Sequence, residues 1–374
     1  MILGSFPYFS ERSLNTITRE IRLMLKSGRL TDGPYLQAFE KKFAAYSGVR
    51  FAVGVSSGSA SLDIALRHYK LQGREVIVPT NTFIATPNGI VFAGGKPVFA
   101  DMNSQTLGID VEDVKRKVTD KTVGVIVVHI AGLVCPQIRE LKTFCHDHGL
   151  FLIEDSAHAH GATLDGQKAG TFGDIGCFSF YPTKVMTACE GGMIITNQET
   201  FIDTAKCVRT CGQNNDRLMV VLGHNWRMNE MSAIVGRNQL EHIEEFIEKR
   251  NQIAFWYKDA LCDANDVTLF RVPSNLRHSY YKYPLLLADG IDRNKIVSLL
   301  RAKYQIETGH VYYPPCHLHP YYMTTYGTKM GDHPTAERVL KQVLCLPMHY
   351  SLTKENVNYI SRSLISALAE STNA

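Results

Sequence analysis

The chain has 374 residues and a mass of 41.9 kDa, more than one ordinary globular module, so we expect two domains. Hydrophobic residues make up 45% of it and charged residues 20%, a composition that builds a large core and excludes a disordered chain. The formal charge of +4 argues against a dedicated nucleic-acid-binding protein, whose basic surplus is larger and clustered. It leaves room for a phosphorylated small molecule.

Neither a membrane span nor a secretory signal is visible in the sequence. The longest apolar run, residues 123–135, contains His129 and is too short to cross a bilayer. The first twelve residues lack a charged segment followed by a long apolar stretch. We therefore expect a cytoplasmic protein that acts on no membrane and no nucleic acid.

The cysteines and histidines invite a metal-site interpretation that we reject. Nine cysteines without C-x-x-C pairs do not form the framework of a disulfide-rich protein. Residues 145–148 and 316–319 both read C-H-x-H, but adjacent residues on a strand point to opposite faces and do not converge on one ion. We predict no metal site.

In chain order, helices come first and a strand-rich region follows. Apolar residues recur at helical spacing between Ser10 and Gly28, and again from Pro34 to a stop at Gly48. Short β-rich runs then occupy 51–55, 75–79, 97–100, 123–129, 151–153, 175–180 and 193–196, with helical segments at 61–69 and 138–146 among them. Several runs are nearly continuous in Val, Ile, Leu and Phe, as in strands covered on both faces. This alternation predicts an α/β domain with a mostly parallel sheet flanked by helices.

A long amphipathic helix over residues 231–249 is expected to bridge to a second domain. The region after it mixes a strand at 283–287 with helices at 293–301 and 354–368. We predict a large domain at 1–250, with an N-terminal helical arm, and a smaller α+β domain at 251–374.

The first of four segments that suggest chemistry is the small-residue loop 55–60, between a predicted strand and a predicted helix. Gly58, Ser59 and Ala60 would let backbone N–H groups approach an anion at the helix N-terminus. When the loop is taken alone, an ordinary serine N-cap is the favoured interpretation. The dinucleotide fingerprint and the P-loop are both absent.

The other three segments are polar sites beside predicted strand ends. Glu154 and Asp155 end the strand at 151–153, where open α/β sheets bind ligands, although an aspartate there can simply cap a helix. Lys184 stands between a strand end and the double glycine of 190–192, an unusual place for a solvated lysine. The loop 223–229, G-H-N-W-R-M-N, opens the long helix and can also be a capping segment.

Taken in order, these segments resemble the DegT family of sugar aminotransferases. The motifs are the small-residue loop, T-F, E-D-x-A-H, F-S-F-x-x-x-K, E-G-G and G-x-N-x-R, and the similarity runs from about residue 30 to residue 348. The lysine motif followed by E-G-G is the most specific of them. The family consists of pyridoxal 5′-phosphate (PLP) enzymes with the aspartate-aminotransferase fold, fold type I, and the resemblance implies that fold here.

The resemblance also implies the cofactor contacts. Lys184 matches the lysine that holds PLP covalently and later carries a proton, and Asp155 matches the carboxylate that pairs with the ring nitrogen. His158 would lie near the ring and its 3′-oxygen, where many relatives have glutamine. Phe83 matches a residue that stacks on the ring, with a core phenylalanine as the alternative. The positions that match phosphate ligands are Gly58, Ser59, Ala60 and Ser179.

Three further residues are implied to complete the site. Asn225 matches a residue that reaches the phosphate from the neighbouring subunit, so the resemblance implies a homodimer with shared active sites. Arg227 and His310 fall where relatives contact the sugar. Two departures from the family pattern, Val185 and Cys189, affect no cofactor contact.

We therefore predict a transaminase that moves an amino group from an amino acid, L-glutamate, to a keto-sugar linked to a nucleotide. One alternative is a PLP-dependent sugar dehydratase of the same fold, but that branch has histidine in place of Lys184. A second is a binding or regulatory protein without turnover, which the presence of Lys184 and Asp155 disfavours. A third is an enzyme that acts on a free cyclitol or keto-acid sugar.

Overall fold

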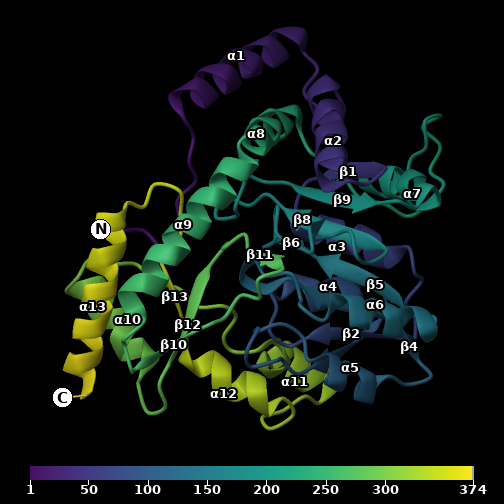
Figure 1. The fold of residues 1–374 in the computed structure, drawn as a ribbon. Helices are drawn as coiled ribbons and strands as arrows, with labels where there is room; N and C mark the ends of the chain where they lie inside the picture. Colours follow the sequence, from purple (N-terminus) through teal and green to yellow (C-terminus); the bar gives the residue numbers. More distant parts are fainter. Residues whose placement is uncertain (373–374) are drawn as a thin grey trace.

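The computed structural model describes residues 1–372 and is built around a seven-stranded sheet with helices on both faces (Figure 1). In spatial order the strands are β1 (Phe51–Val55), β9 (Gly192–Thr196), β8 (Ile175–Ser179), β5 (Phe151–Asp155), β4 (Thr122–Val128), β2 (Glu75–Pro79) and β3 (Lys96–Ala100). Only β9 is antiparallel to its neighbours, and all other pairs are parallel. The mostly parallel sheet predicted from the apolar runs is therefore confirmed.

Helices bury both faces of this sheet. One face packs on α3 (Gly58–Arg67), α4 (Ala85–Phe92) and α7 (Glu199–Arg209). The other packs on α5 (Val111–Lys117), α6 (Ile138–Asp147), α2 (Pro34–Ser47) and α8 (Glu230–Glu241). Every residue of β2 and β5 is buried, which explains why these strands lack polar alternation. No helix within residues 1–372 is both long and apolar enough to cross a membrane.

The N-terminal helix α1 (Glu11–Ser27) follows the pattern expected from its sequence. The Ser10 side chain accepts a hydrogen bond from the Ser13 N–H at 3.1 Å, and Gly28 ends the helix at φ +69°. Ile17 and Met24 pack on α8, so α1 lies across that helix at one end of the molecule (Figure 1).

The single helix predicted over residues 231–249 is wrong, because the chain forms two helices there. Between α8 and α9 (Ile243–Leu261), His242 leaves helical geometry at φ −110° and ψ 4°. Its ring nitrogens lie 3.3 Å from the Ser13 hydroxyl and 3.3 Å from the Glu245 carboxylate. The amphipathic pattern continues through His242, so it could not reveal the break.

The C-terminal region has its own sheet and core. Its antiparallel strands β10 (Val267–Leu269), β12 (Tyr283–Leu287) and β13 (Val343–Leu346) pack with α9, α10 (Arg293–Ala302) and α13 (Lys354–Thr372). The remaining elements are η1 (Ile130–Gly132), η2 (Cys316–Leu318), α11 (Pro320–Tyr326), α12 (Pro334–Gln342) and the small sheet of β6 (Thr163–Leu164), β7 (Gln167–Lys168) and β11 (Leu276–Arg277).

The chain passes residue 250 inside α9 without a break. This helix contributes Ile247 to the core beside the large sheet and Ile253 to the core of the C-terminal region. The first residues also contact that region, since Ile2 forms a parallel bridge with Ile306. The division into domains at residue 250 stays a prediction.

Candidate functional site

A cavity of about 460 Å³ lies where β5 and β8 end and α3 begins. Residues implied by the family motifs meet there: Gly58, Ser59, Phe83, Asp155, His158, Ser179 and Lys184 all line it. They come from four separate stretches of the chain. The carboxyl ends of parallel strands share one edge of a sheet, which is why the fold brings these stretches together.

Asp155 forms the floor of this cavity at the end of β5. Its carboxylate accepts hydrogen bonds from the Thr86 hydroxyl at 2.8 Å and from the Ala157 N–H at 3.1 Å. The residue is only 6% exposed. Burial raises the pKa of Asp155, although these two hydrogen bonds and the positive charge of Lys184 act against it. A cation placed against this carboxylate would relieve the cost of its burial.

Lys184 lies on a loop that folds back after β8. The Thr187 hydroxyl and the Ala188 N–H both bond to the Phe180 carbonyl oxygen at 2.9 Å, and these contacts fix the loop. The Nζ of Lys184 lies 4.6 Å from the centre of the Tyr281 ring. Burial lowers the pKa of Lys184, partly offset by Tyr281 and Asp155. An amine with a lowered pKa is nucleophilic nearer to neutral pH.

The start of α3 lies at the cavity and packs closely on the ends of β8 and β9. Ser57 caps the helix by accepting from the Ala60 N–H at 3.1 Å, and Gly58 and Ser59 line the cavity in the first turn, where N–H groups have no partner inside the helix. A Cβ on Gly58 would lie 2.6 Å from the Cβ of Ser179, and one on Gly192 would lie 2.3 Å from the Ser57 carbonyl oxygen. Glycine at these two positions lets α3 approach the ends of β8 and β9.

His158 is held between two tyrosine rings. Its centre lies 4.2 Å from that of Tyr281, and its Nε2 lies 2.9 Å from the Tyr312 hydroxyl. Nδ1 is buried and has no hydrogen-bond partner within residues 1–372. Burial lowers the pKa of His158 well below its usual value, and Lys184 lowers it further. The ring is therefore neutral and keeps one nitrogen available to a ligand.

Several pocket residues were not anticipated from the sequence. Thr86, which donates a hydrogen bond to Asp155, stands one helical turn after Thr82. Its spacing from the T-F motif could therefore have predicted that it lies in the site. Tyr312 belongs to a segment, 312–317, that the resemblance includes. Tyr281 lies far along the chain from the lysine motif that it contacts in space, and no sequence pattern identifies it.

Four implied residues do not line the cavity. Ala60 is in α3, but its N–H is taken by Ser57. Asn225 is exposed on the loop before α8, and Arg227 pairs with Val55 at the end of β1. His310 is exposed, and its carbonyl accepts from Lys282 Nζ at 2.8 Å.

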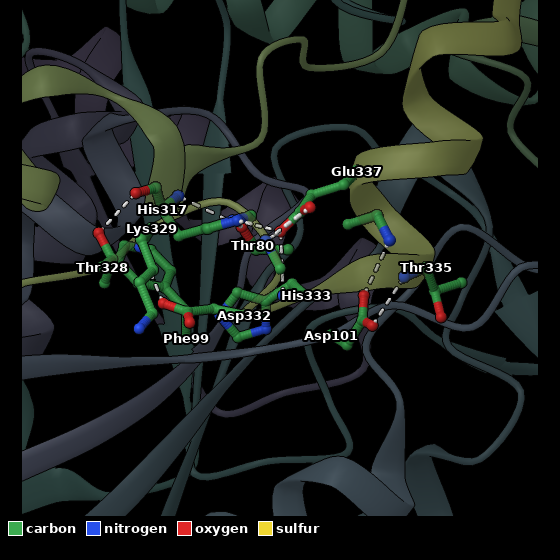
Figure 2. Close-up of polar contacts among 12 residues, drawn as sticks. Thr80, Phe99, Asp101, His317, Thr328, Lys329, Asp332, His333, Thr335 and Glu337 are labelled. Atoms are coloured by element: carbon green, nitrogen blue, oxygen red, sulfur yellow. Dashed lines mark hydrogen bonds and ion pairs between the residues drawn. The ribbon is translucent and has the colours of Figure 1, made fainter.

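A second buried polar cluster lies behind the pocket wall, and Figure 2 shows its contacts. His317 Nε2 lies 3.0 Å from the Glu337 carboxylate, and the Thr80 hydroxyl lies 2.7 Å from His317 Nδ1 (Figure 2). Because the carboxylate can only accept, Nε2 carries the proton and Thr80 donates to Nδ1. The adjacent Cys316 bonds to loop 80–83 through its N–H and its thiol. These contacts fasten the C-terminal region to the loop that carries Phe83.

No group of three or more His, Cys, Asp or Glu side chains in the part of the chain that the structure describes is arranged to hold a metal ion. In the C-H-x-H segment at 316–319, the Cys316 thiol donates to the Thr82 carbonyl oxygen at 3.0 Å, and both ring nitrogens of His317 have protein partners. Those contacts connect two parts of the fold.

Comparison with known proteins agrees with this geometry. A model of the DegT/DnrJ/EryC1/StrS aminotransferase family matches residues 12–365. GDP-perosamine synthase of Escherichia coli O157:H7 is 36% identical, over 89% of this chain and 90% of its own. UDP-N-acetyl-3-dehydro-alpha-D-glucosamine 3-aminotransferase of Acidithiobacillus ferrooxidans is 33% identical, over 87% and 86%. Helicobacter pylori PseC, an aminotransferase involved in the biosynthesis of pseudoaminic acid, superposes with a TM-score of 0.93 at 25% identity, over 99% of each chain.

The sheet, the helices on its two faces and the lysine pocket define a fold type I aminotransferase. The chain belongs to the DegT/DnrJ/EryC1/StrS aminotransferase family. The predicted family, fold class and transaminase activity are confirmed, and PLP is the general cofactor of this family.

Proposed function

We propose that this aminotransferase uses PLP, bound at Lys184, to move an amino group from L-glutamate to the keto carbon of a nucleotide-linked sugar. The observation that carries the proposal is the meeting of the Lys184 amine and the buried Asp155 carboxylate in one cavity of about 460 Å³. The names of the relatives support the acceptor, because two of them contain a sugar linked to GDP or UDP.

The pocket residues fit PLP at each of its polar groups. The first turn of α3 and Ser179 would bind the phosphate, which suits an anion at a helix N-terminus. Asp155 would accept a hydrogen bond from the protonated ring nitrogen, and the unpartnered Nδ1 of His158 would form a hydrogen bond with the ring oxygen. Phe83, which lines the same cavity, would pack on the ring. When bound, PLP would supply an aldehyde that reacts with amines and a ring that takes up an electron pair.

The chain's own residues then have separate tasks. Lys184 would take a proton from the substrate carbon that carries nitrogen and give it to the cofactor carbon on the other side of that nitrogen, and its lowered pKa favours that exchange near neutral pH. Asp155 would keep the ring nitrogen protonated, and this positive partner would oppose the effect of burial on its pKa. Thr86 and Ala157 orient the carboxylate for this contact.

A homodimer with shared sites is part of the proposal. Asn225 is exposed and does not line the cavity of its own chain, as expected for a residue that contacts the phosphate in a neighbouring subunit. The segment before it is unusually apolar for an exposed loop, with Leu218, Met219, Val220 and Leu222 all more than half exposed. Arg227 and His310 would contact the sugar from the mouth of such a shared site.

The test uses purified protein, glutamate and a panel of nucleotide-linked keto-sugars. We expect amino transfer to at least one of them and a visible absorbance band with PLP, and Lys184→Ala should lose both. Lys282→Ala is the matched control, because Lys282 lies beside the same tyrosine but bonds to the His310 carbonyl. It should keep the band.

Labelling after borohydride reduction identifies the lysine directly. A label on any lysine other than Lys184 would overturn the site. Bound PLP without transfer to any sugar in the panel would instead favour a regulatory protein. Transfer only to free cyclitols or keto-acid sugars would reject the nucleotide-linked acceptor.

A further inference from the structure

Tyr281 touches three groups that are central to the cavity, although no motif points to it. Its hydroxyl lies 3.1 Å from the Thr183 hydroxyl, and its ring centre lies 4.6 Å from Lys184 Nζ and 4.2 Å from the centre of the His158 ring. The residue lines the cavity from the segment just before β12, a strand of the C-terminal sheet. Thr183 and Lys184 are adjacent, so Tyr281 contacts two consecutive residues of the lysine loop.

We propose that Tyr281 is a positioning residue for the amine of Lys184, which its ring holds in the cavity whenever that amine is not bonded to the cofactor. The inference rests on the proposed role of Lys184 as proton carrier. The hydroxyl contact with Thr183 fixes the ring, and the ring face then receives the protonated amine.

The physical reason is that a free lysine side chain has many rotamers and a charged end that prefers water. An ammonium group over an aromatic face is attracted to the ring, most strongly where water is excluded. Here Tyr281 and Asp155 line the same cavity as Lys184, and both raise the pKa of its amine. These two contacts raise the proton affinity of the amine, whereas burial lowers it.

Other charges act on the same amine and have to be counted. The charged and titratable groups that act on Lys184 or Tyr281 are Asp155, His158, His160, Arg250 and Lys282, and Glu190 and Tyr312 line the same cavity. Arg250 and Lys282 are cations, whereas burial lowers the pKa of both histidines, so neither histidine adds a further positive charge near pH 7. Removing the ring therefore leaves Lys184 with Asp155 as its chief favourable neighbour.

The experiment measures the proton affinity of Lys184 in the protein without cofactor and compares it with turnover in the loaded enzyme. Reductive methylation at a series of pH values, read by mass spectrometry, gives the pKa of the amine. We expect Tyr281→Leu to lower this pKa by about one unit, a tenfold change in proton affinity, and to lower kcat about tenfold with KM changed less than about twofold. Tyr281→Phe keeps the ring but removes the hydroxyl, which also hydrogen-bonds to Lys184 and contacts Thr183, so it should lower the pKa of Lys184 by less than Tyr281→Leu does.

Two further variants keep the result decisive. Tyr280→Phe is the matched control, since Tyr280 stacks on His278 and does not line the cavity, and it should behave as wild type. Tyr281→Met also lacks a ring face, but its flexible side chain adapts to irregular gaps, and it replaces the leucine variant if that protein does not fold.

An unchanged pKa of Lys184 in both the leucine and the methionine variant overturns the proposal. The methylation measurement needs no PLP. It therefore reports on the contact even if Lys184 proves not to be the cofactor lysine, a failure that the borohydride label would show separately.

Discussion

Two buried clusters in this molecule each centre on a histidine, yet only one of them borders space for a ligand. The open cluster, Asp155, His158 and Lys184, lines the cavity, and His158 Nδ1 has no partner in the described residues. The closed cluster, Thr80, His317 and Glu337, satisfies both nitrogens of His317, whose side chain is 0% exposed (Figure 2). Unsatisfied hydrogen-bonding capacity beside a cavity therefore distinguishes a site for chemistry from a structural contact.

Proton affinity alone does not separate the two clusters. Burial lowers the pKa of His158 and that of His317 alike. The difference lies in what each histidine contacts, since His317 pairs with a carboxylate across two parts of the fold. A network in which every member is bonded rigidifies the structure, whereas a half-satisfied one has a cost that a ligand can remove. The following variants test that distinction.

The largest effect is expected from Asp155→Asn in the open cluster. The amide is neutral and would no longer keep a ring nitrogen protonated, so kcat should fall by about 10³-fold. Stability of the protein without cofactor should change by less than about 1 kcal/mol, because burial already disfavours the charge and Thr86 can still donate to the amide oxygen. Steady-state kinetics and urea unfolding measure the two quantities.

Asp101→Asn is the matched control for that variant. Asp101 accepts from the N–H groups of Thr335 and Ala336 at the start of α12, near the closed cluster (Figure 2). It should lose about 1 kcal/mol of stability and keep its kcat. Equal losses of kcat in the two variants would mean that buried carboxylates matter here only for folding.

Sequence patterns predicted the sheet and the open cluster better than the closed one. The strand at 151–155 and the lysine loop carry local sequence motifs. The strands of the sheet were predicted from apolar runs, which are visible in the sequence even when the segments that pack on them are unknown. Tyr281 and the closed cluster depend on which distant segments meet, and a single sequence does not encode that in any local period. His317 looked like part of a C-H-x-H segment until its partners Thr80 and Glu337 were known.

The second effect in size is expected from His317→Ala in the closed cluster. Removal of the ring leaves the Glu337 carboxylate and the Thr80 hydroxyl with fewer partners in a buried place, which should cost about 3 kcal/mol of the free energy of unfolding. The kcat of the folded enzyme should stay within about threefold of wild type, since His317 does not line the cavity. Urea unfolding checks the first value, and assays at low temperature check the second. A fall in kcat comparable to that of Asp155→Asn would mean that the closed cluster is also needed for catalysis.

The smallest effect concerns the pH dependence of the same variant. Burial lowers the pKa of His317 below its usual value, so the unfolded chain binds the extra proton first, and the stability that the neutral ring contributes is lost as the pH falls below about 6.5. The pKa of Glu337 is also lowered, because hydrogen bonds from the Gly331 and His333 N–H groups and from His317 outweigh its burial, and its contribution is lost at still lower pH. The difference in unfolding free energy between wild type and His317→Ala should therefore narrow, by about 1 kcal/mol, between pH 7 and pH 5. Urea unfolding at both pH values measures it, and a gap that stays constant or widens would mean that His317 is already charged at pH 7 and that the pair with Glu337 is ionic.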